Sequence, residues 1–177
     1  MTALALNKKS PLEVAATGVI VVLGLPGEVA RELAVPGELP AADLHVTLAF
    51  FGSANEVGGA RLETMRAAVA SFAARTPVLR GRVTGTGRFT REDGPDVAYV
   101  SVDAPEMAGL RAELLREVAD AANVEADDSH GFTPHITVAF VAADEPHPSG
   151  RVRPFDFAFD TLELWAGPRR DVFSLSG

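Results

Sequence analysis

The chain has 177 residues, of which 47% are hydrophobic and 23% charged, and its formal net charge at pH 7 is −8. This composition is globular, unlike that of disordered, collagen-like or coiled-coil chains, and the length suits one domain. The acidic balance argues against a protein that holds long nucleic acid, and the absence of cysteine excludes disulfides, thiolate zinc sites and cysteine nucleophiles.

Strands and helices are predicted to alternate in the first half of the chain. The apolar, β-branched run 18–25 predicts a buried strand, and a short helix is expected over 28–33. Residues 44–51 predict a second strand. Apolar residues then recur at helical spacing between 55 and 75, which predicts an amphipathic helix that ends before Pro77.

The second half repeats this alternation and ends in strands. The further elements predicted are strands over 78–89 and 97–102, a helix over 107–121, and strands over 134–141, 157–165 and 171–175. The order β-α-β-α-β-β-α-β-β-β predicts a single α+β domain over 1–177, with helices packed on a largely antiparallel sheet. Residues 1–15 are expected to form a flexible N-terminal extension.

No apolar stretch approaches the roughly 18 to 20 residues that a membrane span requires. Lys8 and Lys9 precede the first apolar run, but Pro11 and Glu13 intervene and no small-residue cleavage site follows. We therefore expect a cytoplasmic protein with no membrane partner.

Two predicted strands contain nearly the same heptapeptide. Residues 44–50 read Leu-His-Val-Thr-Leu-Ala-Phe, and residues 134–140 read Pro-His-Ile-Thr-Val-Ala-Phe. The histidine, threonine, alanine and phenylalanine positions are identical, so the chain looks like two related halves.

The repeated histidine and threonine fall on one face of each strand. Because side chains alternate along a strand, His45 and Thr47 share a face, as do His135 and Thr137. If the halves pair about an approximate two-fold axis, two imidazoles and two hydroxyls meet on one concave face of the sheet.

This set of groups suits phosphodiester chemistry without a metal or other cofactor. A neutral imidazole can take a proton from the attacking hydroxyl or water, while a protonated partner gives one to the leaving oxygen. Threonine hydroxyls can donate to the non-bridging phosphate oxygens. A zinc site would favour His-x-His, and neither a Gly-x-Ser-x-Gly elbow nor a P-loop is present in the sequence.

The alternative interpretation is that both histidines are half-buried core residues. A single His-x-Thr on a strand is usually incidental. The duplication with matched flanks favours function, because a purely structural repeat would keep apolar residues rather than a polar pair that is costly to bury.

Residues 45–52 and 132–139 resemble the two motifs of the two-histidine (2H) phosphoesterase superfamily. The likeness is greatest to its bacterial branch, the 2′-5′ RNA ligases, also called RNA 2′,3′-cyclic phosphodiesterases, and it extends over 18–175. The resemblance implies a bilobal fold, with two β-α-β type halves around a central cleft and helices outside. It also implies metal-independent attack on a 2′,3′-cyclic or 2′-5′ phosphodiester. The expected partner is a small nucleotide or an RNA terminus, and the expected state is a monomer.

The same resemblance implies a role for each motif residue. His135 would be the general base that activates water, and His45 the general acid. Thr47 and Thr137 would hold the phosphate. For ring closure or ligation, the two histidines would exchange roles by microscopic reversibility.

One departure from the family pattern concerns charge. Many relatives carry an arginine directly after the second motif, whereas residues 139–141 of this chain read Ala-Phe-Val. Either Arg88, Arg91 or Arg151 substitutes, or the substrate carries less charge than a terminal RNA phosphate. The alternative for each arginine is an ordinary solvated charge.

Aromatic residues near the motifs are candidates for stacking on a nucleobase. Phe51 has the parity of His45 and Phe132 lies at the mouth of the second motif strand, so Phe51, Phe132 and Arg88 are the predicted substrate-binding residues. Phe89 and Tyr99 flank a Gly-Pro loop and are further candidates for stacking. The remaining histidines, His130 and His147, are expected to be solvated surface residues.

Two other functions stay open at the level of sequence. The chain can be a module that binds a nucleotide or an RNA end without turnover. It can also be a hydrolase or sponge of cyclic oligonucleotide signals in host-virus conflict, because loops rather than the fold select the substrate.

Overall fold

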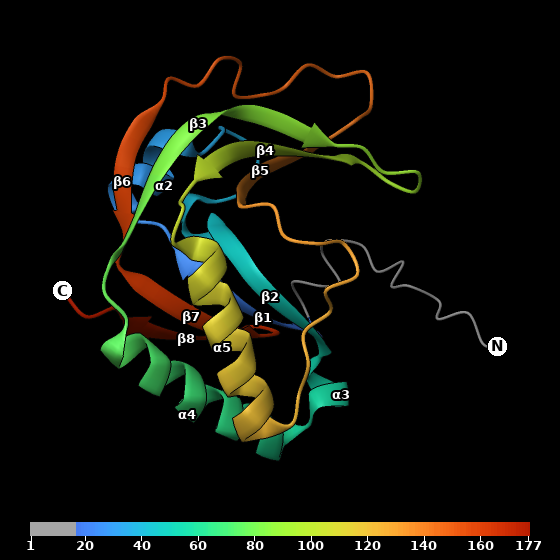
Figure 1. Cartoon of the computed structure of the whole chain (residues 1–177). Coiled ribbons are helices and arrows are strands. Elements are labelled where there is room, and N and C mark those ends of the chain that lie inside the picture. The colour runs from blue at the N-terminus through green and yellow to red at the C-terminus, as the bar shows by residue number, and fades with distance from the viewer. Residues whose placement is uncertain (1–16) are drawn as a thin grey trace.

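Figure 1 shows the computed structural model of the chain, which describes residues 17–177. The predicted extension, residues 1–15, lies outside the described residues. In chain order the elements are β1 (Gly18–Gly24), α2 (Gly27–Leu33), the 3-10 helix η1 (Ala41–Asp43), β2 (His45–Ser53), α3 (Ala54–Val57), α4 (Gly59–Arg75), β3 (Leu79–Phe89), β4 (Asp96–Asp103), α5 (Met107–Ala122), β5 (His135–Val141), β6 (Phe155–Phe159), β7 (Thr161–Ala166) and β8 (Arg169–Ser174).

The strands form one eight-stranded antiparallel sheet in the order β6-β3-β4-β5-β2-β1-β7-β8. The predicted α+β class is confirmed. The two strands with the repeated heptapeptide, β2 and β5, are neighbours at the centre and are joined through Val46 and Ile136. The strand order is therefore mirrored about this seam, with β1, β7 and β8 on one side and β4, β3 and β6 on the other.

The prediction of a single strand over 157–165 is wrong. The structure places β6 and β7 there, separated by Asp160, and β6 pairs with β3 whereas β7 pairs with β1. The apolar positions change parity between the two strands, from Phe157 and Phe159 in β6 to Leu162 and Leu164 in β7. This shift marks a break near Asp160, but it does not reveal the change of partner strand. Since one residue connects the two, the outer parts of the sheet approach each other at this point (Figure 1).

The helix predicted over 55–75 is interrupted near its start. Gly58 has φ +86°, a backbone conformation that favours glycine, and it separates α3 from α4. Ser53 begins α3 with a capping box, in which its hydroxyl accepts from the N–H of Glu56 and the Glu56 carboxylate accepts from the N–H of Ser53.

Helices α4 and α5 lie side by side and cover one face of the sheet (Figure 1). Their buried residues join one apolar cluster with the inward side chains of the central strands, and this cluster includes Met65, Val69, Phe72, Leu114, Val118, Val46 and Ile136. Burial of each large apolar side chain contributes roughly 1.5–3 kcal/mol. Packing of one face in this way leaves the polar motif residues on the opposite face.

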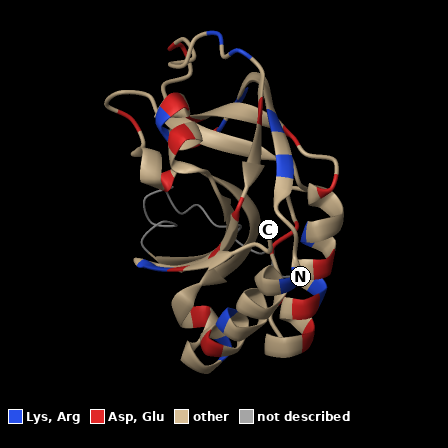
Figure 2. Ribbon diagram, turned by 90° about the vertical axis from the view of Figure 1, so that its left-hand side faces the viewer, with Lys and Arg blue, Asp and Glu red and all other residues tan. Residues whose placement is uncertain are grey.

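Charged residues of both signs are interspersed along the helices and loops, as Figure 2 shows. Within residues 17–177, no helix combines the length and apolar character that a bilayer crossing would need.

Candidate active site

The two His-x-Thr motifs lie on the same face of the two central strands. His45 and Thr47 of β2 and His135 and Thr137 of β5 are all half-buried, whereas the residues between them are fully buried in the core. Because β2 and β5 are antiparallel and paired at the residue between each histidine and threonine, the histidine of one strand lies opposite the threonine of the other.

Each motif strand contains a β-bulge directly after its threonine. The bulged residue is Leu48 in β2 and Val138 in β5, since the register with the neighbouring strand skips both. The bulge shifts the alternation by one residue, so Phe50 rather than Phe51 returns to the face of His45. Phe51 is only 6% exposed and packs in the core, and the prediction that it binds substrate is wrong.

Both imidazoles are anchored in the same way. The Nδ1–H of His45 donates to the carbonyl of Asp43, and the Nδ1–H of His135 donates to the carbonyl of Thr133, each at 2.7 Å. These bonds fix the tautomer and leave Nε2 as the nitrogen that can exchange a proton. In His45 this Nε2 lies 3.1 Å from the Thr47 hydroxyl oxygen.

His45 lies in an aromatic and cationic environment that disfavours its protonation. Its ring packs edge to face against Trp165 at 4.5 Å, and Arg170 stacks on Trp165 at 3.8 Å while pairing with the Asp43 carboxylate. Burial, above all, lowers the pKa of His45 to about 4; the charges of Arg170 and His135 add to this, and the Asp43 carbonyl and carboxylate oppose it. His45 is therefore neutral at pH 7 in the free protein.

The surroundings of His135 are aromatic. Phe89 of β3 and Tyr99 of β4 stack on each other at 4.3 Å, and their centroids lie 4.9 Å and 5.3 Å from that of the imidazole. Burial lowers the pKa of His135, opposed by the hydrogen bond to the Thr133 carbonyl.

The predicted substrate-binding residue Arg88 is used elsewhere. It pairs across the sheet with Ala98, which is buried, so its side chain leaves β3 on the face opposite to Phe89. The guanidinium forms an ion pair with Asp96 at 3.1 Å and donates to the carbonyls of Ala142, Ala143 and Glu145. Arg88 thus holds the loop after β5, and the structure does not bring it to the imidazoles.

The other predicted substrate-binding residue, Phe132, is half-buried against the core. Arg111 of α5 lies over its ring at 4.8 Å, and the Nε–H of Arg111 donates to the carbonyl of Leu48, the bulged residue of β2, at 2.7 Å. The same guanidinium pairs with Asp128 in the loop that precedes β5. Phe132 and Arg111 therefore connect the two motif strands by packing.

One of the two remaining histidines differs from its expectation as a solvated residue. His147 is half-buried, donates from Nε2 to the carbonyl of Tyr99 at 3.1 Å, and accepts from the N–H of Ser149. His130 is exposed as expected. Neither forms a metal cluster: in the part of the chain from residue 17 onward, no three His, Asp or Glu side chains gather where they could hold a metal ion.

Sequence reasoning missed the residues that surround His45. Trp165 and Arg170 come from the last two strands, more than a hundred residues after His45. The signal available was the parity of positions 161, 163 and 165, which places three polar or amphipathic side chains on one face. It could not show which strand they would pair with.

Comparison with known proteins gives one family and several solved structures of the same fold. The sequence model of the 2′-5′ RNA ligase superfamily matches residues 27–170. No curated protein sequence matches the chain significantly.

Several solved structures share the fold. TT0787 of Thermus thermophilus superposes with a TM-score of 0.63 at 24% identity, and E. coli LigT complexed with 3′-AMP superposes with 0.63 at 19%; each comparison covers 90% of this chain and 95% of the other. Kluyveromyces marxianus Usb1 with uridine monophosphate gives 0.54 at 12% identity, over 92% of this chain and 100% of that one.

Proposed function

Because the chain belongs to the 2′-5′ RNA ligase superfamily of 2H phosphoesterases, we propose that it is a phosphodiesterase that acts on 2′,3′-cyclic or 2′-5′ phosphodiesters of small nucleotides or RNA termini. The observation that carries the proposal is the placement of two anchored His-x-Thr pairs on one face of adjacent strands. The mononucleotides named with LigT and Usb1 support a substrate of nucleotide size.

In the proposed reaction the phosphate lies between the two pairs. Thr47 and Thr137 donate hydrogen bonds to its non-bridging oxygens, whose charge grows in the transition state. His135 takes a proton from the attacking water through Nε2, and His45 gives a proton to the leaving ribose oxygen. Neither step requires a metal ion.

The electrostatics of the two imidazoles support this division of roles. The pKa of His45 is lowered by burial and further by the charges of Arg170 and His135, whereas burial is the only lowering cause at His135. His135 is thus the better base, and His45, once protonated, gives up its proton readily. An anionic phosphate in the site raises both pKa values and supplies the condition under which His45 becomes charged.

The experiment that tests the proposal is an assay of nucleoside 2′,3′-cyclic phosphates and 2′-5′ dinucleotides, with products separated by chromatography. We expect turnover that EDTA leaves unchanged. Loss on chelation with recovery on adding zinc or manganese would contradict the metal-independent mechanism. Binding without product at any pH would instead identify a nucleotide-binding module, and turnover confined to cyclic di- or trinucleotides would identify a hydrolase of signals.

A further inference from the structure

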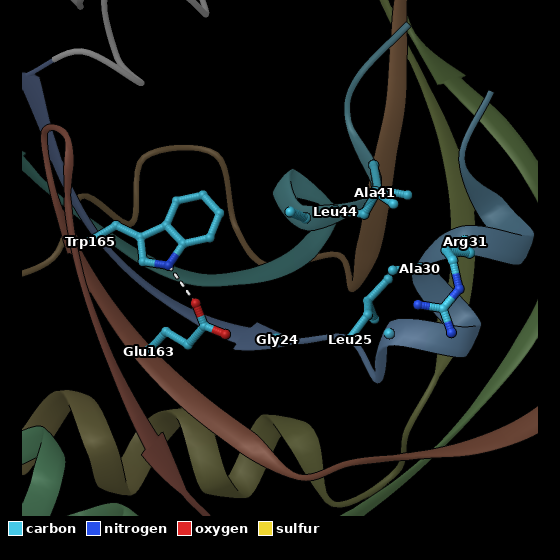
Figure 3. A pocket seen from close by; sticks show the side chains of 10 residues that line it. Gly24, Leu25, Ala30, Arg31, Ala41, Leu44, Glu163 and Trp165 are labelled. Atoms are coloured by element: carbon cyan, nitrogen blue, oxygen red, sulfur yellow. Dashed lines mark hydrogen bonds between the residues drawn. The ribbon is translucent and has the colours of Figure 1, made fainter. Parts of the chain in front are cut away.

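Figure 3 shows the residues that line a cavity of about 300 Å³. It is bounded by the end of β1, by α2 and η1, and by β7; Leu44 and Trp165 line it, and Trp165 also contacts the imidazole of His45. Its volume is at the lower end of the roughly 300–1,000 Å³ that small-molecule sites have. The proton transfers proposed for the two histidines leave this cavity unused.

A missing side chain beside His45 makes room for the carboxylate of Glu163, one of the residues that line the cavity. Gly24 is the β1 residue that pairs with His45, and a Cβ atom there would lie 2.2 Å from Oε1 of Glu163 and 2.4 Å from Oγ1 of Thr161. A residue with a side chain would therefore displace the Glu163 carboxylate. Glycine at this position lets the Glu163 carboxylate lie over β1, next to the strand β2 that carries His45.

The Glu163 carboxylate is oriented by two hydrogen bonds and still has unused acceptor positions. It accepts from Nε1–H of Trp165 at 2.7 Å and from the Thr161 hydroxyl at 3.3 Å. A carboxylate has about four acceptor positions, so two remain for a ligand. Its negative charge also opposes a second phosphate group here. The cavity therefore suits the uncharged, donor-bearing part of a nucleotide, which is the nucleobase.

Arg31 lies at the end of the cavity opposite to Trp165 and Glu163, as Figure 3 shows. Within residues 17–177 it has no carboxylate partner, so its guanidinium donors are available. The cavity thus offers acceptors at one end and donors at the other.

Guanine is the nucleobase that matches this arrangement. Its N1–H and N2–H are adjacent donors for one carboxylate, and its neighbouring O6 and N7 acceptors are the atoms that arginine contacts in a bidentate manner. Adenine and cytosine place a ring-nitrogen acceptor beside their amino group, and uracil flanks its N3–H with two carbonyls. Each would turn a lone pair toward Glu163.

We propose that this cavity is a guanine-binding subsite, and that the substrates are phosphodiesters with guanosine on the His45 side of the scissile phosphate. The inference rests on the proposed phosphodiesterase function, which places the phosphate between the histidines. Glu163 and Arg31 are its specificity-determining residues.

The test uses guanosine 2′-monophosphate and inosine 2′-monophosphate, which differ only in the N2 amine. Trp165 is the only tryptophan of the chain, so its fluorescence reports occupation of the cavity in the unlabelled protein. We expect guanosine 2′-monophosphate to bind about tenfold more tightly, because inosine loses one hydrogen bond to a charged group. Glu163→Gln should bring this ratio close to one. The matched control Glu32→Gln, on an exposed residue of α2 that does not line the cavity, should keep it.

Equal binding of the two nucleotides, or a ratio that survives in Glu163→Gln, would overturn the guanine subsite. Hydrolysis of the four common nucleoside 2′,3′-cyclic phosphates by the same protein separates this result from failure of the proposed function. We expect the guanosine compound to have the highest kcat/KM. Turnover without base preference would overturn the subsite alone, and no turnover of any of the four, with guanosine-selective binding intact, would overturn the phosphodiesterase proposal alone.

Discussion

The backbone around the two histidines has the same geometry in both halves of the molecule, whereas the side chains that surround the two imidazoles differ. Both motif strands have the same bulge after the threonine, and both histidines donate to the carbonyl two residues earlier. The heptapeptide and the residue just before it thus determine the position and tautomer of each imidazole. The features that distinguish the two histidines come from the side chains of other elements, such as Trp165 and Arg170 beside His45 and Phe89 and Tyr99 beside His135.

In each half, a glycine lies near the histidine, but on a different strand counted outward from the motif strand. Beside His45 the glycine is on the adjacent strand, at Gly24, and the side chains come from the next strand, β7. Beside His135 this order is reversed: the adjacent strand β4 supplies Tyr99, and the next strand supplies Gly87, where a Cβ would lie 2.4 Å from the Tyr99 ring. One half therefore gains a hydrogen-bonding cavity and the other an aromatic wall.

The two His-x-Thr pairs are thus alike, whereas the side chains that surround them differ between the two halves. A phosphodiester has two ends, and an enzyme that acts on one orientation must tell them apart. In the proposed reaction, Trp165 and Glu163 beside His45 and the aromatic pair beside His135 would provide that distinction, while the two threonines would bind the phosphate oxygens alike.

The largest expected effect comes from removal of either imidazole. His45→Ala and His135→Ala should each lower kcat/KM on a nucleoside 2′,3′-cyclic phosphate by roughly 10² to 10⁴, because each removes one proton transfer. Thermal unfolding measured in parallel should show intact folds. His130→Ala, a change of an exposed histidine outside the site, should keep full activity. Full activity of His45→Ala or His135→Ala would show that the symmetric pair is not the catalytic apparatus.

A second measurement distinguishes the two halves by leaving group. A p-nitrophenyl phosphodiester needs no proton on its leaving oxygen, so it relieves the need for a general acid but not for a base. We expect His45→Ala to regain roughly 10² of its lost rate on this substrate and His135→Ala to regain little. The opposite pattern would exchange the two roles, and equal recovery would show that neither half has a fixed one.

The sequence predicts the symmetric part of this comparison well. The duplicated His-x-Thr motif and the alternation of faces are local properties, so they placed His45, Thr47, His135 and Thr137 on two related strands. The error at Phe51 came from a bulge, which a strict period of two does not include.

The asymmetric part depends on contacts that are distant in the chain. Trp165 and Glu163 approach His45 only because β7 pairs with β1, after the chain crosses from one half to the other at Asp160. Arg88 had a suitable charge and position in the sequence, but a register shift in β3 and its pairing with Asp96 direct it to the opposite face. Periodicity does not determine strand order or the partner of a charged side chain.

Alanine substitutions at Gly87 and Gly24 test the role of each glycine. Gly87→Ala should cost about 1–3 kcal/mol of unfolding free energy, because the new methyl group meets the Tyr99 ring, which is packed against His135. Gly24→Ala should cost less, since the nearest atom that the methyl group meets is the end of the flexible Glu163 side chain, but it should weaken guanosine binding. Gly85→Ala is the matched control, because a Cβ there meets nothing within 4 Å. Denaturant unfolding of the three variants gives the comparison, and equal losses would contradict it.

The smallest expected effect concerns the charge beside His45. Both imidazole pKa values are lowered in the free protein, so above about pH 6.5 the state with one proton on the pair becomes rarer as pH rises, and kcat/KM should fall. Arg170→Gln removes a charge that lowers the pKa of His45, so it should raise that pKa and, at each pH above about 6.5, the fraction of the protein in which His45 carries the proton. At pH 8 the kcat/KM of the variant should then be a few-fold higher than that of the wild type. Arg169→Gln, whose guanidinium pairs with Glu63 and Asp171, should leave the profile in place. An unchanged profile in Arg170→Gln would mean that burial and Trp165, rather than the Arg170 guanidinium stacked on Trp165, set the proton affinity of His45. The surroundings of the two histidines would then differ in packing but not in their electrostatic effect.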